Sequence, residues 1–116
     1  MSDGSGLSRS NGITTKIQAG VLHKIFCDTT VYKSFNASLP VSGQSGGMIN
    51  IGKGSQAEGN MRAKSGYINR ARSYCGYFKN LKGEEYSFSI IVNNYNCSPK
   101  EVKQKMENLM IIFCGL

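Results

Sequence analysis

The C-terminal segment carries the pattern that most restricts how this chain can fold. Residues 98–101 read Ser-Pro-Lys-Glu, which joins a helix-capping serine to a glutamate three residues later, with proline at the first helical position. Apolar side chains then recur at helical spacing, at Val102, Met106, Leu109, Met110 and Phe113. Such a stripe needs a second apolar surface to bury it, so we predict a helix over residues 98–114 that covers a sheet.

The segment before this helix predicts the sheet. Apolar and polar residues alternate along residues 86–93, which places Tyr86, Phe88, Ile90 and Val92 on one apolar face. Residues 61–66 and 73–79 also read as strands, and Asn-Leu-Lys-Gly at 80–83 supplies a turn. We therefore predict three antiparallel strands within residues 61–93.

The N-terminal half predicts helices and one long loop. Residues 1–12 are rich in Gly and Ser and are expected to be irregular, whereas apolar residues at helical spacing predict a helical region over residues 13–39. Its first helix reaches about Asp28, and Pro40 ends the second piece. Residues 41–60 hold six glycines and are expected to form a loop. The fold class that results is α+β: a three-stranded antiparallel meander with N- and C-terminal helices packed on one face.

Charge and hydropathy exclude several kinds of protein. Fourteen basic and seven acidic residues give a net charge of +7, but no run of five like charges and no nucleic-acid-binding motif occurs. We therefore expect no nucleic-acid partner, although a basic nucleic-acid-binding domain stays open as a third interpretation. The longest apolar run, residues 109–114, is far shorter than the roughly 20 residues of a membrane span, and residues 1–12 show no signal peptide.

The four cysteines do not indicate a metal site or a cofactor. Cys27, Cys75, Cys97 and Cys114 form no C-x-x-C motif, and four cysteines permit three disulfide pairings that the sequence does not distinguish. His23 and Cys27 lie four residues apart on a predicted helix, where they can share a metal or simply pack together. We predict no metal and no cofactor.

Residues 64–66, Lys-Ser-Gly, are the candidate site. Lysine and serine at consecutive strand positions point to opposite faces, and the glycine leaves the backbone open. At a sheet edge, this backbone can pair with an extended peptide. A bare tripeptide also fits a purely structural role.

Four longer stretches resemble a known family. DGSGLSRSN at 3–11, SLPVSGQSGG at 38–47, GNMRAKSGYINRARSYCGYF at 59–78 and EEYSFSIIVNNY at 84–95 are similar, in this order, to class C penicillin-binding proteins. These are low-molecular-mass D-alanyl-D-alanine carboxypeptidases and endopeptidases of bacterial cell-wall metabolism. The resemblance implies a β-lactamase/transpeptidase-like fold, a periplasmic or other extracytoplasmic location, and a peptidoglycan stem peptide or β-lactam as partner.

The resemblance also implies roles for the candidate site. The family uses three motifs, S-x-x-K, S-x-N and K-T-G, and residues 64–66 match the third with serine in place of threonine. Lys64 would then be the catalytic residue that adds positive charge. Ser65, with Gly66 beside it, would bind the terminal carboxylate of the substrate, and the backbone N–H of Tyr67 would be one of two oxyanion donors.

Departures from the family pattern define what this chain is expected to lack. No serine has a lysine three positions later, so the nucleophile motif is absent, and we interpret Ser34-Phe35-Asn36 as a chance S-x-N. We expect residues 1–116 to be the C-terminal part of a transpeptidase-like domain, inactive on its own, with an exposed strand edge that promotes self-association. The alternative is a non-catalytic module that binds peptides or peptidoglycan on the same fold.

Overall fold

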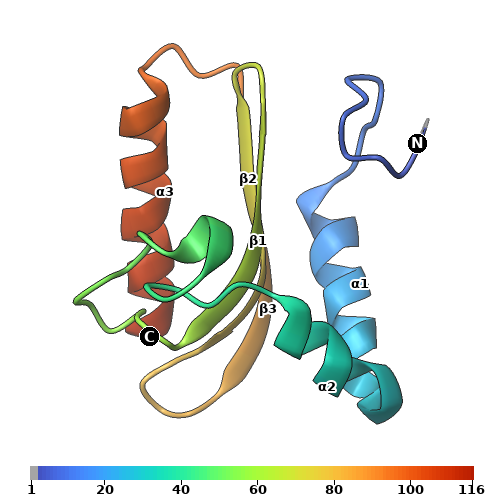
Figure 1. Ribbon diagram of the computed structural model, residues 1–116, viewed down its shortest axis with the longest axis vertical. Coiled ribbons are helices and arrows are strands. Elements are labelled where there is room, and N and C mark those ends of the chain that lie inside the picture. Colours follow the sequence, from blue (N-terminus) through green and yellow to red (C-terminus); the bar gives the residue numbers. More distant parts are fainter. Residues whose placement is uncertain (1–2) are drawn as a thin grey trace.

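A three-stranded antiparallel sheet forms the centre of the structure. The computed structural model describes residues 3–116 and places β1 (Met61–Ile68), β2 (Ala71–Lys79) and β3 (Glu85–Asn93) in the order β1-β2-β3 (Figure 1). Met61 is paired with Phe78 at one end of the β1–β2 ladder, and Ile68 with Ala71 at the other. The predicted antiparallel meander and the α+β class are confirmed.

Turn chemistry explains the two hairpins. Arg70 adopts a left-handed conformation, with φ of 59°, between β1 and β2. The side-chain oxygen of Asn80 accepts hydrogen bonds from the backbone N–H groups of Lys82 (3.0 Å) and Glu84 (2.9 Å), which closes the turn between β2 and β3. Gly83 supplies the positive φ, 79°, that this turn requires.

Helix α3 (Pro99–Cys114) covers one face of the sheet. Ser98 caps it by accepting a hydrogen bond from the N–H of Glu101, as the sequence predicts. Its buried residues are Val102, Met106, Met110 and Cys114. They pack with Tyr74, Phe78 and Phe88 of the sheet in one apolar core. Full burial of one such side chain stabilises the fold by about 1.5–3 kcal/mol.

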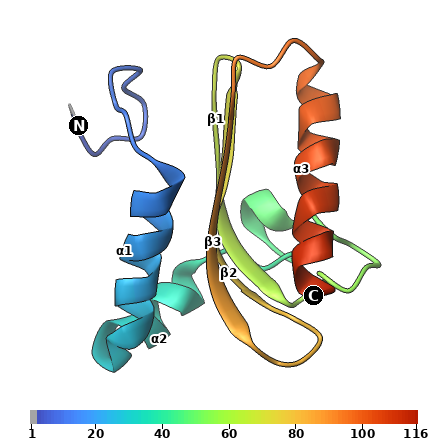
Figure 2. The ribbon, with the colours of Figure 1, turned by 180° about the vertical axis from the view of Figure 1, so that it is seen from behind.

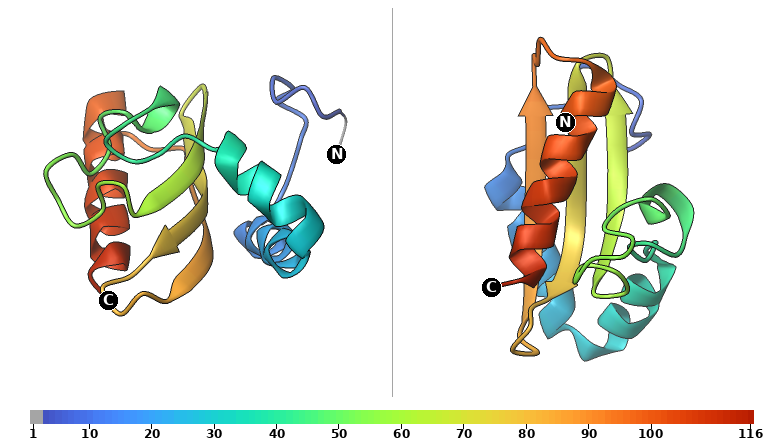
Figure 3. Two further views of the ribbon diagram at one scale, coloured as in Figure 1. Left: turned by 60° about the horizontal axis from the view of Figure 1, so that its bottom comes forward. Right: turned by 90° about the vertical axis from the view of Figure 1, so that its left-hand side faces the viewer.

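Helices α1 (Thr15–Cys27) and α2 (Thr29–Ser38) lie on the opposite face, so the expectation that all helices share one face is wrong. Figures 1 and 2 show the sheet between α3 on one side and α1 with α2 on the other, and the right-hand view of Figure 3 shows α3 in front of the strands. On this second face the Tyr77 ring packs against Phe26, Tyr32 and Phe35, and hydrogen bonds add to this packing. Tyr77 donates to the carbonyl of Leu22 (2.6 Å), and Ser89 donates to the side-chain oxygen of Gln18 (2.7 Å).

The N-terminal region follows the expected boundaries closely. Thr14 caps α1 by accepting a hydrogen bond from the N–H of Ile17, and Asp28 separates the two helices while capping α2. Residues 3–12 contain no helix or strand, as expected of the irregular stretch 1–12, and residues 1–2 of that stretch lie outside the described part.

Residues 41–60 form a loop that is anchored in the core. It contains one short 3-10 helix, η1 (Gly46–Met48), an isolated bridge from Val41 to Arg62, and otherwise turns and bends. Met48, Ile51 and Ala57 are fully buried, and Ser42 donates a short hydrogen bond to the carbonyl of Ala57. The loop is therefore a packed part of the fold.

Gly76 on β2 sets how closely β1 and β2 approach. A Cβ atom at this position would overlap the backbone carbonyl oxygen of Arg62 and press on Ala63 across the ladder. Neither of these obstacles is the flexible end of a side chain. The sheet therefore depends on the absence of a side chain here.

We predict that Gly76→Ala destabilises the chain by about 1–3 kcal/mol, because the added methyl group must push two paired strands apart. Chemical denaturation followed by circular dichroism measures this change. Gly20→Ala is the matched control, since Gly20 lies in α1 with no atom within 4 Å of its added Cβ. The control should be neutral or stabilising by up to about 1 kcal/mol. Equal stability of the two variants would contradict the assigned register.

Candidate functional site

The candidate site lies on an edge strand. Strand β1 has a sheet neighbour on one side only in the described part of the chain. The start of its outer edge is covered, because Ser42 donates its N–H to the carbonyl of Met61 (2.9 Å) and Ala63 donates to that of Pro40 (3.0 Å). Since alternate residues of a strand direct N–H and C=O to the same side, Ser65 and Tyr67 face this outer edge beyond the covered portion.

Lys64 and Ser65 both reach the open part of this edge. The ammonium of Lys64 donates a 2.6 Å hydrogen bond to the carbonyl of Ser65, so the positive charge lies against the edge itself. The hydroxyl of Ser65 lies against Gly47, where a Cβ atom would overlap it. Two stretches that resemble the same family, 38–47 and 59–78, therefore meet at this serine.

A cavity of about 430 Å³ joins this edge to the N-terminal segment. Lys64, Ser65, Gly66 and Tyr67 line it together with Gly6, Ser8, Asn11, Ile13 and Gln18 from the other side. Ser73, Cys75 and Ile91 belong to its floor on β2 and β3. All four predicted site residues therefore border one space. No Asp or Glu of the described residues lines it, so its fixed charge is positive.

The N-terminal segment is shaped by its own hydrogen bonds. The backbone N–H of Asp3 donates to the side chain of Asn11 (3.2 Å), and the Asn11 amide donates back to the carbonyl of Asp3 (3.0 Å). The hydroxyl and backbone N–H of Ser5 also donate to the Asp3 carboxylate, which lowers the pKa of that carboxyl. The segment forms a closed loop that faces β1 across the cavity.

Cys75 lies across from Lys64 in the ladder and lines the same cavity. Burial raises the pKa of its thiol, and the nearby charge of Lys64 opposes that effect only in part. The thiol therefore stays protonated at neutral pH, which makes it a poor nucleophile.

A cluster of two tyrosines and one arginine lies beside the site, and no sequence motif indicated it. The Arg72 guanidinium carbon lies 5.0 Å from the centre of the Tyr67 ring. Arg72 Nε and the Tyr95 hydroxyl are both buried, and burial raises the pKa of Tyr95. Tyr67 and Arg72 are cross-strand partners, and this neighbourhood becomes evident only from the register of β1 and β2.

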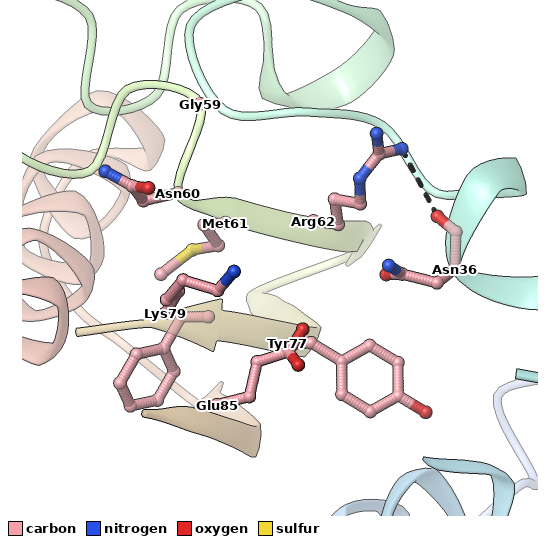
Figure 4. Close-up of a pocket in the computed structure, with 9 residues that line it drawn as sticks. Asn36, Gly59, Asn60, Met61, Arg62, Tyr77, Lys79 and Glu85 are labelled. Carbon is pink, nitrogen blue, oxygen red and sulfur yellow. Dashed lines mark hydrogen bonds between the residues drawn. The ribbon is translucent and has the colours of Figure 1, made fainter. Parts of the chain in front are cut away.

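The chance S-x-N of residues 34–36 lies elsewhere. Ser34 and Asn36 belong to α2, and neither lines the cavity beside Lys64. Asn36 borders a second, smaller cavity of about 170 Å³ near Arg62 and Glu85 (Figure 4). The interpretation of this motif as a coincidence stays a prediction.

Residues 3–116 show neither a metal site nor a membrane-spanning helix. No three His, Cys, Asp or Glu side chains gather there in a group that could hold a metal ion. His23 and Cys27 approach to 3.8 Å on α1 without a third ligand. None of the described helices is both long and apolar enough to cross a bilayer.

Similarity to known proteins extends over almost the whole chain. The model of the D-Ala-D-Ala carboxypeptidase 3 (S13) family matches residues 1–112. A D-alanyl-D-alanine carboxypeptidase of Actinomadura sp. (strain R39) is 34% identical over an alignment of 101 residues, and the match covers 83% of this chain and 18% of that protein. The chain thus spans less than a fifth of this curated relative.

Solved structures agree with the family. Two structures of penicillin binding protein 4 from Haemophilus influenzae, one of them with a β-lactam, are each 25% identical to this chain. They match with TM-scores of 0.85 and 0.87 over 98% and 100% of this chain, and over 28% and 27% of theirs.

A predatory endopeptidase from Bdellovibrio bacteriovorus shares the fold, with a TM-score of 0.63 over 93% of this chain and 31% of its own, at 18% identity. Sequence and structure therefore confirm the family resemblance and the transpeptidase-like fold. The chain belongs to the D-Ala-D-Ala carboxypeptidase 3 (S13) family.

Proposed function

We propose that residues 1–116 supply one wall of a cleft that binds acyl-D-alanyl-D-alanine peptides. The observation that carries this proposal is the open half of the β1 edge, where the backbone groups of Ser65 and Tyr67 face outward beside the Lys64 ammonium. An extended peptide can add to such an edge through main-chain hydrogen bonds. The positive, carboxylate-free cavity next to it suits a peptide that ends in a carboxylate.

Each residue of the Lys-Ser-Gly motif has a role in this proposal. The Ser65 hydroxyl donates to the terminal carboxylate, and the Lys64 ammonium adds charge to the same end of the cleft. Gly66 lets β1 lie close to Ser73 of β2, whose hydroxyl occupies the place of a Cβ atom at residue 66. The N–H of Tyr67 points at the scissile carbonyl and stabilises the oxyanion that forms there.

The nucleophile is not among these residues. No serine of the chain precedes a lysine by three positions, and the Cys75 thiol in the cavity is held protonated. We propose that the chain alone binds but does not cleave. In a longer protein of this family, the serine and its lysine would come from sequence outside residues 1–116. The alternative, a binding module without catalysis, uses the same cleft.

We propose that this activity belongs to bacterial cell-wall metabolism outside the cytoplasm, which membership of the family supports. The substrate class would be a peptidoglycan stem peptide, and a β-lactam would occupy the same position as a mimic of it. The similarity to structures of penicillin binding protein 4, one with a β-lactam bound, supports this assignment.

Ser65→Ala should weaken binding of diacetyl-L-lysyl-D-alanyl-D-alanine about tenfold, because it removes a charge-assisted hydrogen bond to the terminal carboxylate. Isothermal titration of the chain with this peptide measures the effect. Ser34→Ala is the matched control, since Ser34 is exposed on α2 and does not line the cavity. A control variant that loses as much affinity as Ser65→Ala would overturn the proposed placement.

The isolated chain should form no covalent adduct with a fluorescent penicillin, because it offers no activated serine. Gel fluorescence after incubation reads this directly, with an intact D-alanyl-D-alanine carboxypeptidase as the positive control. A labelled band at the mass of this chain would show that it contains its own nucleophile.

We also propose that the chain associates with itself through the open edge of β3. Strand β3 pairs only with β2 in the described residues, so one row of its backbone groups has no strand partner. Such an edge can pair with another strand. We predict a molar mass above that of the 12.7 kDa chain, and rising with concentration, in multi-angle light scattering. A constant monomer mass at micromolar concentration would refute self-association through this edge.

A further inference from the structure

A second cavity, with no lining residue in common with the first, lies at the opposite end of the sheet. It measures about 170 Å³ and is bordered by the first residues of β1, the last of β2, the first of β3 and the end of α2. Figure 4 shows side chains of Asn36, Arg62, Lys79 and Glu85 around this space. They supply two cations, one anion and one amide.

The charged groups around this cavity do not neutralise one another. Lys79 and Glu85 are cross-strand partners, yet the ion pair found in residues 3–116 joins Lys105 to Glu101 on α3. Arg62 uses Nη1 for two long hydrogen bonds, to the carbonyls of Asn36 (3.3 Å) and Leu39 (3.4 Å). Because a guanidinium carries five N–H donors, others remain for a ligand.

Two acceptors border the same space, Asn36 next to Arg62 and Glu85 across the ladder from Lys79. Glu85 accepts a 2.9 Å hydrogen bond from the Tyr32 hydroxyl, which fixes its carboxylate. Burial, and next this hydrogen bond to Glu85, raise the pKa of Tyr32, so the phenol keeps its proton and continues to donate. The side-chain oxygen of Asn36 is buried and has no hydrogen-bond partner in the described residues. A buried acceptor without a donor calls for one from a ligand or water.

These observations lead us to a site beyond the proposed peptide cleft: we propose that this cavity binds the zwitterion of a small free α-amino acid. The ammonium lies between Asn36 Oδ1 and the Glu85 carboxylate, and the carboxylate meets Lys79 and the remaining N–H groups of Arg62. A simple anion would leave Asn36 without a donor and would be repelled by Glu85. A simple cation would face Lys79 and Arg62.

Titration of the ¹⁵N-labelled chain with glycine tests the site. We expect saturable amide shifts at Arg62, Lys79 and Glu85, while the amides of Ser65 and Tyr67 stay in place. At equal ionic strength, acetate and methylamine should each bind at least about tenfold more weakly, since each lacks one charged group. Acetate binding as tightly as glycine, or no saturable shift at these residues, would overturn the proposal.

Two variants separate binding from folding. Glu85→Gln keeps an oxygen that accepts from Tyr32 but loses the charge, and should weaken glycine binding about tenfold. Asn36→Asp adds a negative charge beside the ammonium and should tighten glycine binding, a gain that unfolding cannot produce. Glu101→Gln, an exposed change on α3 outside the cavity, is the control and should bind glycine like the unchanged chain. A decrease with Asn36→Asp, or equal affinity of Glu85→Gln and the control, would contradict the assigned positions.

Shifts at Ser65 and Tyr67 instead would place glycine in the peptide cleft and would likewise reject this site. The outcome is independent of peptide binding, because the two cavities share no residue.

Discussion

The division of the β1 edge into a covered half and an open half is the constraint on which the site depends. Backbone hydrogen bonds from residues 40–42 occupy the edge at Met61 and Ala63 and stop there. Beyond that point, alternation along the strand directs the groups of Ser65 and Tyr67 outward. The packed loop at residues 41–60 holds the covering segment in place through its buried residues and brings Gly47 against Ser65. The same packed loop therefore stabilises the fold and shapes the candidate site.

Hydrophobic periodicity predicted the elements better than their arrangement. The C-terminal helix and the third strand were evident because each buries one apolar face, and the structure has both. The position of α1 was not evident, since the strand residues on the face that it covers include Tyr77 and Ser89, whose hydroxyls hydrogen-bond to α1. The spacing of apolar residues in a sequence does not predict that a helix covers such a face. The packing of Met48 and Ile51 was likewise hidden in a glycine-rich stretch that reads as an open loop.

Part of the candidate site could likewise be predicted from the sequence, and part required the tertiary structure. Its strand residues were predicted from the Lys-Ser-Gly motif and the family resemblance, and the structure places them on an edge strand. The contribution of Gly6, Ser8 and Asn11 to the cavity required tertiary structure, because more than fifty residues separate them from Lys64 in sequence. The small cavity at Asn36 and Glu85 was missed for the same reason, since its charged groups come from separate elements.

Backbone amide shifts test most directly whether a peptide adds to the open half of β1. On titration with an acyl-D-alanyl-D-alanine peptide, the N–H resonances of Ser65 and Tyr67 should move most, because they face the outer edge. Those of Gly66 and Ile68, which face β2, should move less. Shifts centred on α3, or equal shifts along all of β1, would contradict the account.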